Sequence, residues 1–576
     1  MRSRSAKRWI RRRADAGQAA QLAAALGVSP VIAAVLVARG LADQARARCF
    51  LHPSLDQLHD PSLMLGMAEA VARILHAIEM NESILIYGDY DVDGTTGTVV
   101  LRRALKILGA RTGYHVPHRF TEGYGIRQEA LERAQADGYR LVISVDCGIR
   151  AHEPLLWARA HGLDVIVTDH HLPDEGEGAP PAYAVLNPNQ KGCAYPDKNL
   201  AGVGVAFKLV HALLRARGRE HLVKGFLKMV AIGTVADVAQ LTGENRIIVA
   251  LGLADLPRAT NPGLRALMRV AGIEGAADAL QASDLGFRLG PRINAAGRMD
   301  AARAVVELFE VEAREEADRL AQHLDARNRE RQIIQREITE RALAELKASY
   351  ADGARVAVIA GDGWHRGVIG LAASKIVERT GVPTVVISFE GDIGHGSARS
   401  IEAYHLLDGL TACADLFEKF GGHAHAAGLV IRRDRIAELR RRLNEHAAAR
   451  LCEADLVPAL HIDAELPSEA LTLDLAQELR CLEPFGAGWP RPIFATPNLR
   501  LVATPRVMKE RHLKLHLTDA SARRVLEAVW WNGAEHLERT PEVGEGIEVA
   551  YALDVNRWRN ETRLQLVVED IQASGR

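Results

Sequence analysis

The stretch SILIYGDYDVDGTTGTVVL, residues 83–101, decides the fold of the first part of the chain. It opens with the apolar run Ile84–Tyr87, which is typical of a strand buried in a parallel sheet. Apolar side chains then return at helical spacing, which predicts a helix over Thr96–Leu108. Between strand and helix lie three aspartates, with no lysine or arginine in the stretch: Asp89, Asp91 and Asp93. Carboxylates this close are costly unless a cation neutralises them, so we expect a cation site where the strand ends.

Short apolar runs alternate with helical patterns along much of the chain. Leu141–Val145 and Val165–Val167 indicate two more buried strands beside the first. Farther on, the strand pattern of Val356–Ala360, the helical pattern of Ile369–Arg379 and the strand pattern of Thr384–Phe389 indicate a second unit of the same kind. Strands that alternate with helices are typical of parallel α/β sheets, so the predicted fold class is α/β.

Residues 312–350 differ in character from both units. They contain no proline or glycine, and apolar residues recur among many charges at near-helical spacing: Leu320, Leu324, Ile334, Ile338 and Leu346. This pattern predicts one long helix that connects two domains. The alternative is a surface helix that belongs to a single domain.

The last part of the chain changes to a period of two. His512–Asp519 and Thr562–Ile571 alternate as half-buried strands do, which predicts a small β-barrel. The segment EPFGAGWPRPIF, residues 483–494, lies within this barrel or leads into it. The barrel carries basic residues suited to a single nucleic-acid strand: Arg500, Arg506, Lys509, Arg511, Lys514, Arg523 and Arg524. Trp530 and Trp531 are candidates for base stacking, but alternation places at least one of them in the core.

Bulk composition excludes several classes of protein. The 576 residues are too many for one core, and the net charge of -1 does not advertise a polyanion partner. Six scattered cysteines without a Cys-x-x-Cys pair argue against a disulfide framework and indicate a reducing compartment. No apolar run approaches the ~20 residues of a membrane span, so no membrane partner is expected. The basic start, MRSRSAKRWIRRRADAGQ, predicts a solvated or DNA-touching arm rather than a transit peptide.

Carboxylates and histidines recur at other element ends. The motif VISVDCG carries Asp146, VIVTDHH carries Asp169, His170 and His171, and AIGTVADVAQL supplies Asp237. A single aspartate at a strand end is more often a helix N-cap than a ligand. Together, however, carboxylates and imidazole predict a site for divalent cations, in which the imidazole favours Mn²⁺ over Mg²⁺. Several acids for few ligand positions indicate two ions, an arrangement suited to phosphoryl displacement.

The second α/β unit offers possible anion contacts. IAGDGWHRGVIG places His365 and Arg366 among glycines just before a helix, which fits either a phosphate cradle or a tight turn. Arg399 in GSARS could bind a phosphate with two hydrogen bonds. His423 lies in the small-residue motif FGGHAHAAGL, where it could face a cleft.

The motifs DYDVDG, VDCG, DHH and VADV, in this order, resemble those of the DHH phosphoesterase superfamily. GPRINAAGRMD (Gly290–Asp300), GHGSARS and FGGHAHAAGL are similar to motifs of the bacterial RecJ exonuclease family within it. The resemblance runs from about Leu51 to the end of the chain. It implies a DHH-type parallel-sheet domain, a long connecting helix, a second, DHH-associated α/β domain and a C-terminal OB-like barrel. The expected boundaries are 1–50 for a basic and helical arm, 51–311, 312–350, 351–450 and 451–576.

The resemblance implies a role for each matching residue. The metal ligands would be Asp91, Asp93, Asp146, His170 and Asp237, with Asp89 either a ligand or a neighbour of one. The catalytic group would comprise His171, which faces the phosphate, together with Asp169, Asn294 and Arg298. Substrate contacts in the second domain would be Ser397, Arg399 and His423, to which the glycine-rich turn adds His365 and Arg366.

The resemblance implies a 5′-to-3′ exonuclease specific for single-stranded DNA, which uses two Mn²⁺ or Mg²⁺ ions, releases 5′-mononucleotides and acts in DNA repair and recombination. The implied partners are a single-strand-binding protein and a RecQ-type helicase, and the implied state is a monomer in the bacterial cytoplasm, associated with the nucleoid. One alternative is a DHH phosphodiesterase that acts on short oligonucleotides or cyclic dinucleotides. The other is a non-catalytic binding protein that has lost its metal site.

Overall fold

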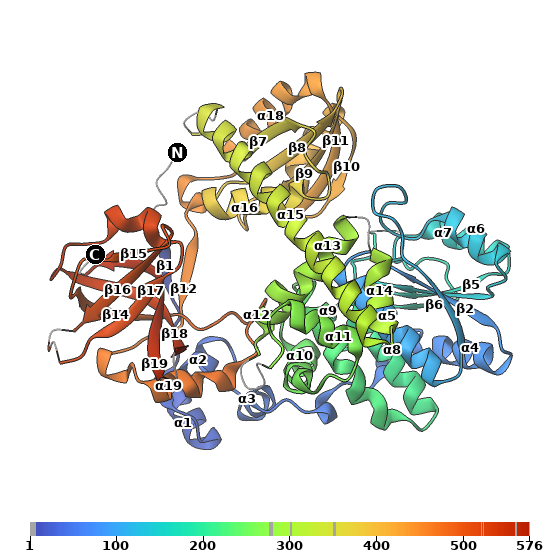
Figure 1. Cartoon of the computed structure of the whole chain (residues 1–576), viewed down its shortest axis with the longest axis horizontal. Coiled ribbons are helices and arrows are strands. Elements are labelled where there is room, and N and C mark those ends of the chain that lie inside the picture. The colour runs from blue at the N-terminus through green and yellow to red at the C-terminus, as the bar shows by residue number, and fades with distance from the viewer. Residues whose placement is uncertain are drawn as a thin grey trace. The chain divides into compact units, whose positions relative to one another are not determined.

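The computed structural model (Figure 1) describes residues 7–174, 176, 178–275, 280–299, 302–349, 353–519, 521, 523–558 and 561–574. Asp300, the last residue of the motif Gly290–Asp300, lies outside the described residues. The chain divides into two compact units, which are described separately below. One consists of Cys49–Glu330 and Glu483–Pro490, and the other of Met1–Arg48, Arg331–Leu482 and Arg491–Arg576.

The first unit is built on a five-stranded, wholly parallel sheet. Its strand order is β3-β2-β4-β5-β6, and the bounds are Arg111–His115, Ser83–Gly88, Leu141–Val145, Asp164–Thr168 and Ala184–Leu186. The three predicted strands are therefore confirmed and lie side by side as β2, β4 and β5. Because all strands run the same way, the ends of β2, β4 and β5 present their following residues at one edge of the sheet.

Helices cover both faces of this sheet, as an all-parallel sheet requires. Helices α4 (Met67–Glu79), α5 (Val92–Ile107) and α8 (Gly202–Ala216) pack on one face, around Ile84, Ile86 and Ile143. Helices α6 (Gln128–Ala136) and α7 (His152–Ala160) pack on the other face, around Leu85, Tyr87 and Val142.

Helix α5 begins four residues before the predicted start at Thr96. Asp91 is its N-cap, and the Asp91 carboxylate accepts a hydrogen bond from the backbone N–H of Gly94 at 3.1 Å. The prediction relied on apolar periodicity, and the first turn has none because it carries Asp93, Gly94 and two threonines. The early start places Asp93 inside the first turn of the helix.

The long helix is confirmed as α15, Arg314–Ser349. Its first part contributes Leu320 and Leu324 to a core of the first unit, together with residues of α11 (Pro262–Val270) and α14 (Ala302–Glu310). Its later part contributes Ile338 and Leu346 to a different core, in the second unit. The helix thus belongs to both cores, which favours the connecting helix over the surface helix of one domain.

The second unit contains the predicted second α/β sheet, which is mixed rather than parallel. Strand order is β10-β11-β9-β8-β7, with bounds Phe417–Gly422, Ala426–Arg432, Ile393–Arg399, Thr384–Glu390 and Ala357–Asp362. Only β7 and β8 pair in parallel, across helix α16 (Ile369–Thr380). Helix α18 (Ile436–Ala448) contributes Leu439 and Leu443 to the core below this sheet.

The predicted barrel is also confirmed. Strands β14, β18, β19, β17 and β16 pair in this order, and a further pairing of β14 with β16 closes the ring. Their bounds are Phe494–Leu501, Gly546–Trp558, Glu561–Ala573, Leu526–Trp530 and His512–Thr518. A closed barrel of five strands is the architecture of an OB fold.

The basic N-terminal segment is not a solvated arm in its described part. Residues Arg8–Arg11 form strand β1, which pairs in parallel with β12 (Ala459–Ile462). The Trp9 indole Nε1 donates to the Asp570 carboxylate of β19 at 3.0 Å, and Lys7 pairs with Glu569. The charge of the segment predicted exposure, but the partners that pair with it lie far along the chain.

By length and composition, no single helix in the described part of the chain could cross a membrane. One sharply bent pair, Leu55–Leu63 with Met67–Glu79, meets the criterion only when the two are taken together.

Candidate active site and metal centre

The predicted metal ligands converge at the edge of the parallel sheet where β2, β4 and β5 end. Asp89 follows β2, Asp91 caps α5, and Asp93 lies in the first turn of α5. Asp89 and Asp93 are buried, with 3% and 1% of their surfaces exposed. Buried carboxylates need a compensating positive partner, and among the described residues none of these three forms an ion pair with lysine or arginine.

Asp93 and Asp146 are held against the start of helix α8. The Asp93 carboxylate accepts hydrogen bonds from the backbone N–H groups of Gly202 at 2.6 Å and Val203 at 2.7 Å. Asp146 follows β4 with a φ of 62°, a strained conformation for a residue other than glycine. A Cβ atom on Gly202 would lie 2.6 Å from Oδ1 of Asp146, so only glycine allows this approach. The α8 N-terminus therefore supports two of the carboxylates from below.

His170 and Asp237 complete the cluster. The Nε2 atom of His170 lies 3.2 Å from Asp146 Oδ1, 3.8 Å from Asp93 Oδ2 and 3.9 Å from Asp237 Oδ2. Asp237 caps the C-terminal end of helix α9 (Leu227–Ala236), so a helix rather than a strand delivers it. Segments from four parts of the sequence thus meet within a few ångströms.

These residues offer ligand atoms in overlapping sets of three. In each set the donor atoms lie within 4.8 Å of one another: Asp89, Asp91 and Asp146; Asp93, His170 and Asp237; Asp146, His170 and His171. The sets contain all six predicted ligands, and Asp146 belongs to more than one of them. Asp146 is shared by the set of three carboxylates and the set with two histidines, and a shared carboxylate is what a pair of bridged divalent ions requires.

Two observations test whether the cluster fits cations. The buried Oδ1 atoms of Asp89 and Asp146 accept no hydrogen bond from the described part of the chain, although the rest of each residue is tightly packed. Burial, and next the charge of Asp91, raise the pKa of Asp93 to about 7. Burial and the charge of neighbouring carboxylates likewise raise the pKa values of Asp89, Asp146 and Asp237 well above their ordinary range. Carboxylates that repel one another and lack donors fit a site made for cations.

The pKa of His170 moves the other way. Burial, and next the positive charge of His171, lower the pKa of His170 to about 4. His170 is therefore neutral at physiological pH, which is the form that binds a metal ion.

His171 has a different environment. Its Nδ1 lies 2.7 Å from Oδ1 of the fully buried Asp169, which also accepts hydrogen bonds from the backbone N–H groups of Ile149, His170 and His171. Burial opposes protonation of His171, but the Asp169 hydrogen bond and charge outweigh it, so the pKa of His171 is raised. Burial likewise acts to raise the pKa of Asp169, yet the contact with His171 and the backbone donors outweigh it, and the pKa is lowered. Asp169 therefore orients the imidazole of His171 and favours its protonated form.

Tyr124 is a site residue that the sequence analysis missed. Its hydroxyl lies 3.1 Å from His171 Nδ1 and 3.3 Å from the backbone carbonyl of Asp146, which accepts its hydrogen bond. Burial raises the pKa of Tyr124, so the group remains a hydroxyl. Its sequence, in RFTEGYGIR, offered a signal only in the glycines on both sides of the tyrosine.

Asn294 and Arg298 lie on helix α13, Gly290–Arg298. The Asn294 side-chain oxygen accepts a hydrogen bond from the backbone N–H of Val92 at 3.3 Å, so it contacts the aspartate-rich loop directly. A Cβ atom on Gly297 would lie 2.3 Å from the backbone oxygen of Tyr90, so the helix needs glycine there to approach this loop. The structure thus brings Asn294 to the carboxylates, and the positive charge of Arg298 acts on Tyr90 next to them.

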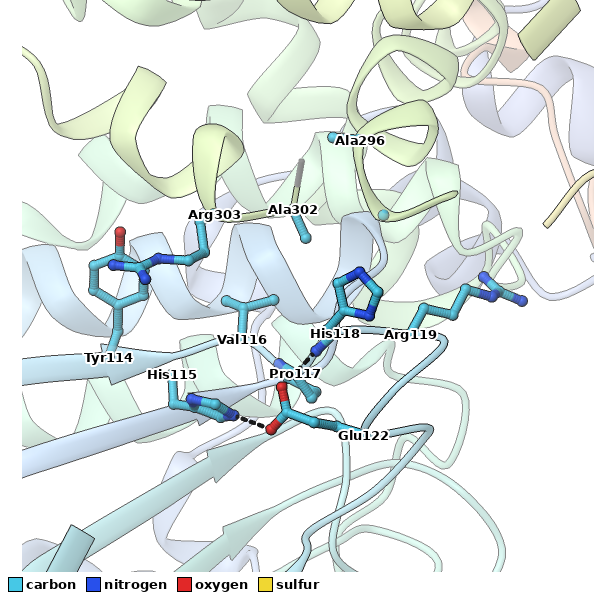
Figure 2. A pocket seen from close by; sticks show the side chains of 11 residues that line it. Tyr114, His115, Val116, Pro117, His118, Arg119, Glu122, Ala296, Ala302 and Arg303 are labelled. Carbon is cyan, nitrogen blue, oxygen red and sulfur yellow. Dashed lines mark hydrogen bonds and ion pairs between the residues drawn. The ribbon is translucent and has the colours of Figure 1, made fainter. Parts of the chain in front are cut away.

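A cavity of about 290 Å³ lies beside this helix, between the end of β3 and helices α13 and α14 (Figure 2). Its lining includes His118, Arg119 and Arg303, together with the aromatic ring of Tyr114, over which Arg303 extends. Glu122 in its wall contacts His115 at 3.0 Å and forms an ion pair with Arg133 at 3.3 Å, which offsets its negative charge. The guanidinium of Arg119 lies 4.9 Å from the Tyr90 ring centroid, which connects the cavity to the aspartate-rich loop. The remaining charge of the wall is basic, as a phosphate-bearing ligand would need.

The predicted substrate contacts of the second α/β domain gather around the start of helix α16. Ser397 and Arg399 lie on one face of β9, and a Cβ atom on Gly370 of α16 would meet both side chains within 2.9 Å. His365 closes the turn before α16, where its Nδ1 accepts from the backbone N–H of Gly367. A helix start lined by serine and arginine is a ready anion site. The tight turn and the phosphate cradle, which the sequence left as alternatives, are therefore compatible, because the turn leads into the helix start that could bind the anion.

Arg366 joins this group through a residue that the sequence analysis missed. Its Nη2 lies 2.8 Å from Nδ1 of His395, which shares the face of β9 with Ser397 and Arg399. The alternation H-x-S-x-R within GHGSARS could have identified His395, because alternate residues of a strand share a face. His423 lies in the turn between β10 and β11, where Ala426 pairs with Arg399.

In the barrel, the two tryptophans differ as alternation predicted. Trp530 is 5% exposed and stacks on His536, so it belongs to the core. Trp531 is 53% exposed and lies with its ring 4.8 Å from that of His512. Of the two, only Trp531 presents its ring at the surface.

Comparison with known proteins agrees with this arrangement. Three family models match: the DHH family N-terminal domain over residues 83–234, the DHHA1 domain over 353–449 and the RecJ OB domain over 462–570. The chain is 38% identical to the single-stranded-DNA-specific exonuclease RecJ of Bacillus subtilis over 99% of its own length and 71% of that protein. It is 36% identical to the Escherichia coli protein of the same name, over 97% of this chain and 98% of that one.

A solved structure agrees over the whole chain. RecJ of Thermus thermophilus in complex with Mn²⁺ aligns with a TM-score of 0.84 and 30% identity, covering 100% of this chain and 81% of that one. A second crystal structure of the same protein was determined with Mg²⁺. With three family models in order along the chain and relatives of this identity and coverage, the chain belongs to the RecJ exonuclease family of the DHH superfamily.

Proposed function

We propose that this chain is a metal-dependent exonuclease that degrades single-stranded DNA from its 5′ end, releases 5′-mononucleotides and acts in DNA repair and recombination. One observation carries the proposal: carboxylates and an imidazole from β2, β4, β5 and α9 converge with buried oxygens that have no donor among the described residues. A closed five-stranded barrel on the same chain supplies the kind of fold that binds single strands.

The cations would be a pair of Mn²⁺ or Mg²⁺ ions. Their proposed ligands are Asp89, Asp91, Asp93, Asp146, His170 and Asp237. When bound, such a pair lowers the pKa of water and neutralises the charge that develops on a phosphate. The neutral imidazole of His170 favours Mn²⁺ among the two.

The chain's own residues orient the substrate and manage a proton. Asp169 fixes the ring of His171 through Nδ1, which leaves Nε2 to donate a hydrogen bond to a phosphate oxygen. A protonated His171 would stabilise the negative charge that builds up during hydrolysis. Asn294 holds the aspartate-rich loop through Val92, and Arg298 adds positive charge next to it.

The 5′-to-3′ direction of degradation would be set by the second α/β domain. Ser397, Arg399, His395 and Arg366 around the start of α16 form a cradle suited to a terminal phosphate. A dianionic 5′-phosphate gains more there than a backbone phosphodiester, because it carries more charge and more acceptor oxygens. Recognition of the terminal phosphate would place the first phosphodiester bond for cleavage.

Single-strand selectivity would depend on the barrel, where Trp531 and basic residues would guide the strand. Contacts of this kind release counterions, so binding should weaken as salt rises. We further propose that the protein acts as a monomer in the bacterial cytoplasm at the nucleoid. A single-strand-binding protein and a RecQ-type helicase would supply its strand.

The test is digestion of a long single strand in Mn²⁺, labelled at the 5′ end in one reaction and at the 3′ end in another. Early release of labelled mononucleotide from the 5′ end, with gradual shortening seen from the 3′ label and no loss of duplex, is the expected result. Cleavage of di- or trinucleotides without attack on the long strand would instead favour a phosphodiesterase of short substrates. A protein that binds the strand but hydrolyses neither would be a non-catalytic relative.

A further inference from the structure

The 483–490 segment, Glu483–Pro490, lies far along the chain from the metal centre yet belongs to the same compact unit. It leaves helix η10 (Leu479–Leu482) and leads toward the first barrel strand, β14. Instead of spanning solvent, it packs on Gln240 and Leu241, which follow Asp237 by three and four residues.

A backbone hydrogen bond and two glycines fix this contact. The Leu241 backbone N–H donates to the Ala487 carbonyl at 2.7 Å. A Cβ atom on Gly486 would lie 2.6 Å from Leu241 Cδ1, and one on Gly488 would lie 3.1 Å from Gln240 Cβ. The two glycines therefore allow the segment to lie directly against the Asp237 loop.

The segment itself is a tight turn whose shape is defined. Gly486 and Trp489 exchange backbone hydrogen bonds at 2.9 and 3.2 Å, and Gly488 has a φ of 72° between them. Trp489 is buried and packs on Phe50 with ring centroids 4.4 Å apart. The turn is thus held from both sides.

Arg246 of helix α10 (Gly243–Asp255) ties the turn to the loop that carries the ligand. Its buried guanidinium donates to the carbonyls of Glu483 at 2.7 Å, Pro484 at 3.1 Å and Phe50 at 3.1 Å. The next residue toward the loop, Asn245, donates from Nδ2 to the Gln240 carbonyl at 3.1 Å. The connection between α9 and α10 is therefore held by Asn245 at Gln240, and the turn that packs on it is held by Arg246.

The loop that follows Asp237 begins with a strained backbone conformation. Val238, next to Asp237, has a φ of 62°, which a β-branched residue rarely adopts, and its side chain is 71% exposed. This conformation closes the end of helix α9, where the Val238 N–H donates to the Val235 carbonyl and the Ala239 N–H donates to the Thr234 carbonyl, both at 3.2 Å. The contacts at Gln240 and Leu241 therefore hold a loop that starts from a strained residue.

We propose that the 483–490 segment positions Asp237 for metal binding, so that affinity for cations depends on the stretch of chain that leads into the barrel. The inference rests on the proposed role of Asp237 as a ligand. In this arrangement Gly486, Gly488 and Arg246 are positioning residues, because none of them contacts the cluster. Groups that orient metal ligands typically change metal affinity by 10–100-fold when they are altered.

The experiment measures Mn²⁺ binding to the full chain from the electron paramagnetic resonance signal of unbound Mn²⁺, without DNA. Gly488→Ala adds one methyl group against Gln240 at a positive φ, and should raise the dissociation constant on the order of ten-fold. Gly162→Ala is the matched control in the same unit, because its φ is 68° and a Cβ atom there meets nothing within 4 Å. The control should bind Mn²⁺ like the unmodified protein, and nuclease activity of Gly488→Ala should recover at high Mn²⁺.

Melting of each variant in a chelator shows whether it is folded. If Gly488→Ala does not fold, Arg246→Lys is used to test the proposal. This variant keeps the positive charge but loses the donors to two of the three carbonyls of Phe50, Glu483 and Pro484. Wild-type Mn²⁺ affinity in a folded Gly488→Ala or Arg246→Lys variant overturns the proposal. Asp237→Asn tests separately whether Asp237 is a metal ligand. If this variant also leaves Mn²⁺ binding unchanged, Asp237 is not a ligand and its proposed role in the metal site is wrong.

Discussion

The Nδ1 atom of His171 lies 2.7 Å from Oδ1 of Asp169, a carboxylate with no exposed surface. Asp169 belongs to none of the ligand sets among the described residues, although it lies next in sequence to His170. Its side chain accepts hydrogen bonds from backbone N–H groups and contacts His171. Its contribution is therefore separable from metal binding.

We predict that Asp169→Asn lowers exonuclease turnover by about 10²–10⁴-fold at saturating Mn²⁺. The pKa of His171 should fall, because the hydrogen bond and charge that raise it are weakened. Turnover measured against pH, with Mn²⁺ affinity measured alongside, checks this. Loss of Mn²⁺ affinity equal to the loss of turnover would show that Asp169 acts through the metal instead.

The metal-free protein should become more stable as pH falls from 8 toward 6. The folded-state pKa of Asp93 is about 7, above its ordinary value of 3.8, so the folded state binds protons more readily than the unfolded chain. The stabilisation by protonation is complete below the unfolded pKa and is lost as pH rises through about 7. Melting temperatures in chelator across this range measure the effect.

Addition of Mn²⁺ should reverse this trend, because cations compete with the protons for the same carboxylates. Mn²⁺ affinity should therefore weaken below pH 7, with proton release on binding detectable by calorimetry in buffers of different ionisation enthalpy. The variant Asp93→Asn should show a smaller pH-dependent gain in the metal-free state and a smaller proton release, because Asp89, Asp146 and Asp237 still bind protons. A melting temperature that rises steadily with pH in chelator would contradict the assignment.

Arg399→Gln should reduce the preference for a 5′-phosphorylated strand. The side chain adjoins Ser397 at the start of α16, so its loss removes a charged contact worth about ten-fold in kcat/KM. Strands with a 5′-hydroxyl end should be degraded by the variant and the unmodified protein at similar rates. An equal loss on both substrates would mean that Arg399 contacts the backbone rather than the terminus.

Trp531→Ala should weaken binding of single-stranded DNA about ten-fold, because an exposed ring is lost as a stacking surface. Trp531→Phe, which keeps an aromatic face, is the matched control and should bind more tightly than the alanine variant. Fluorescence anisotropy with a labelled oligonucleotide in chelator reports binding without cleavage. Unchanged affinity in Trp531→Ala would leave the basic residues as the source of binding.

The sequence predicted the centre of the fold better than its periphery. Strands β2, β4 and β5 were evident because they are apolar on both faces, and their ends located Asp89, Asp146 and Asp169. Parallel strands bring such ends together, so the cluster followed from the sheet itself.

Residues placed by contacts between distant segments escaped prediction. Tyr124 reaches His171 from a loop without periodicity, and the charge of Arg8–Arg11 predicted exposure although Asp570 and Glu569 bind the adjoining residues. The segment 483–494 was expected to lie within the barrel or to lead into it, and nothing in its sequence indicated that Gly486 and Gly488 pack on the Asp237 loop. The residue pattern of one segment does not show which distant segment will contact it.

Strand β1 has a consequence for the order in which the protein is made. Its partner β12 and the carboxylate of Asp570 are translated only after Cys49–Glu330, which forms nearly all of the catalytic unit, so β1 cannot pair until these later parts of the chain have been made. The catalytic unit is thus inserted within the sequence of the other unit, which is made of three separate segments of the chain. A barrel expressed on its own would lack β1 and leave Asp570 without two of its donors, so a working excised module must have residues 7–48 spliced back onto it.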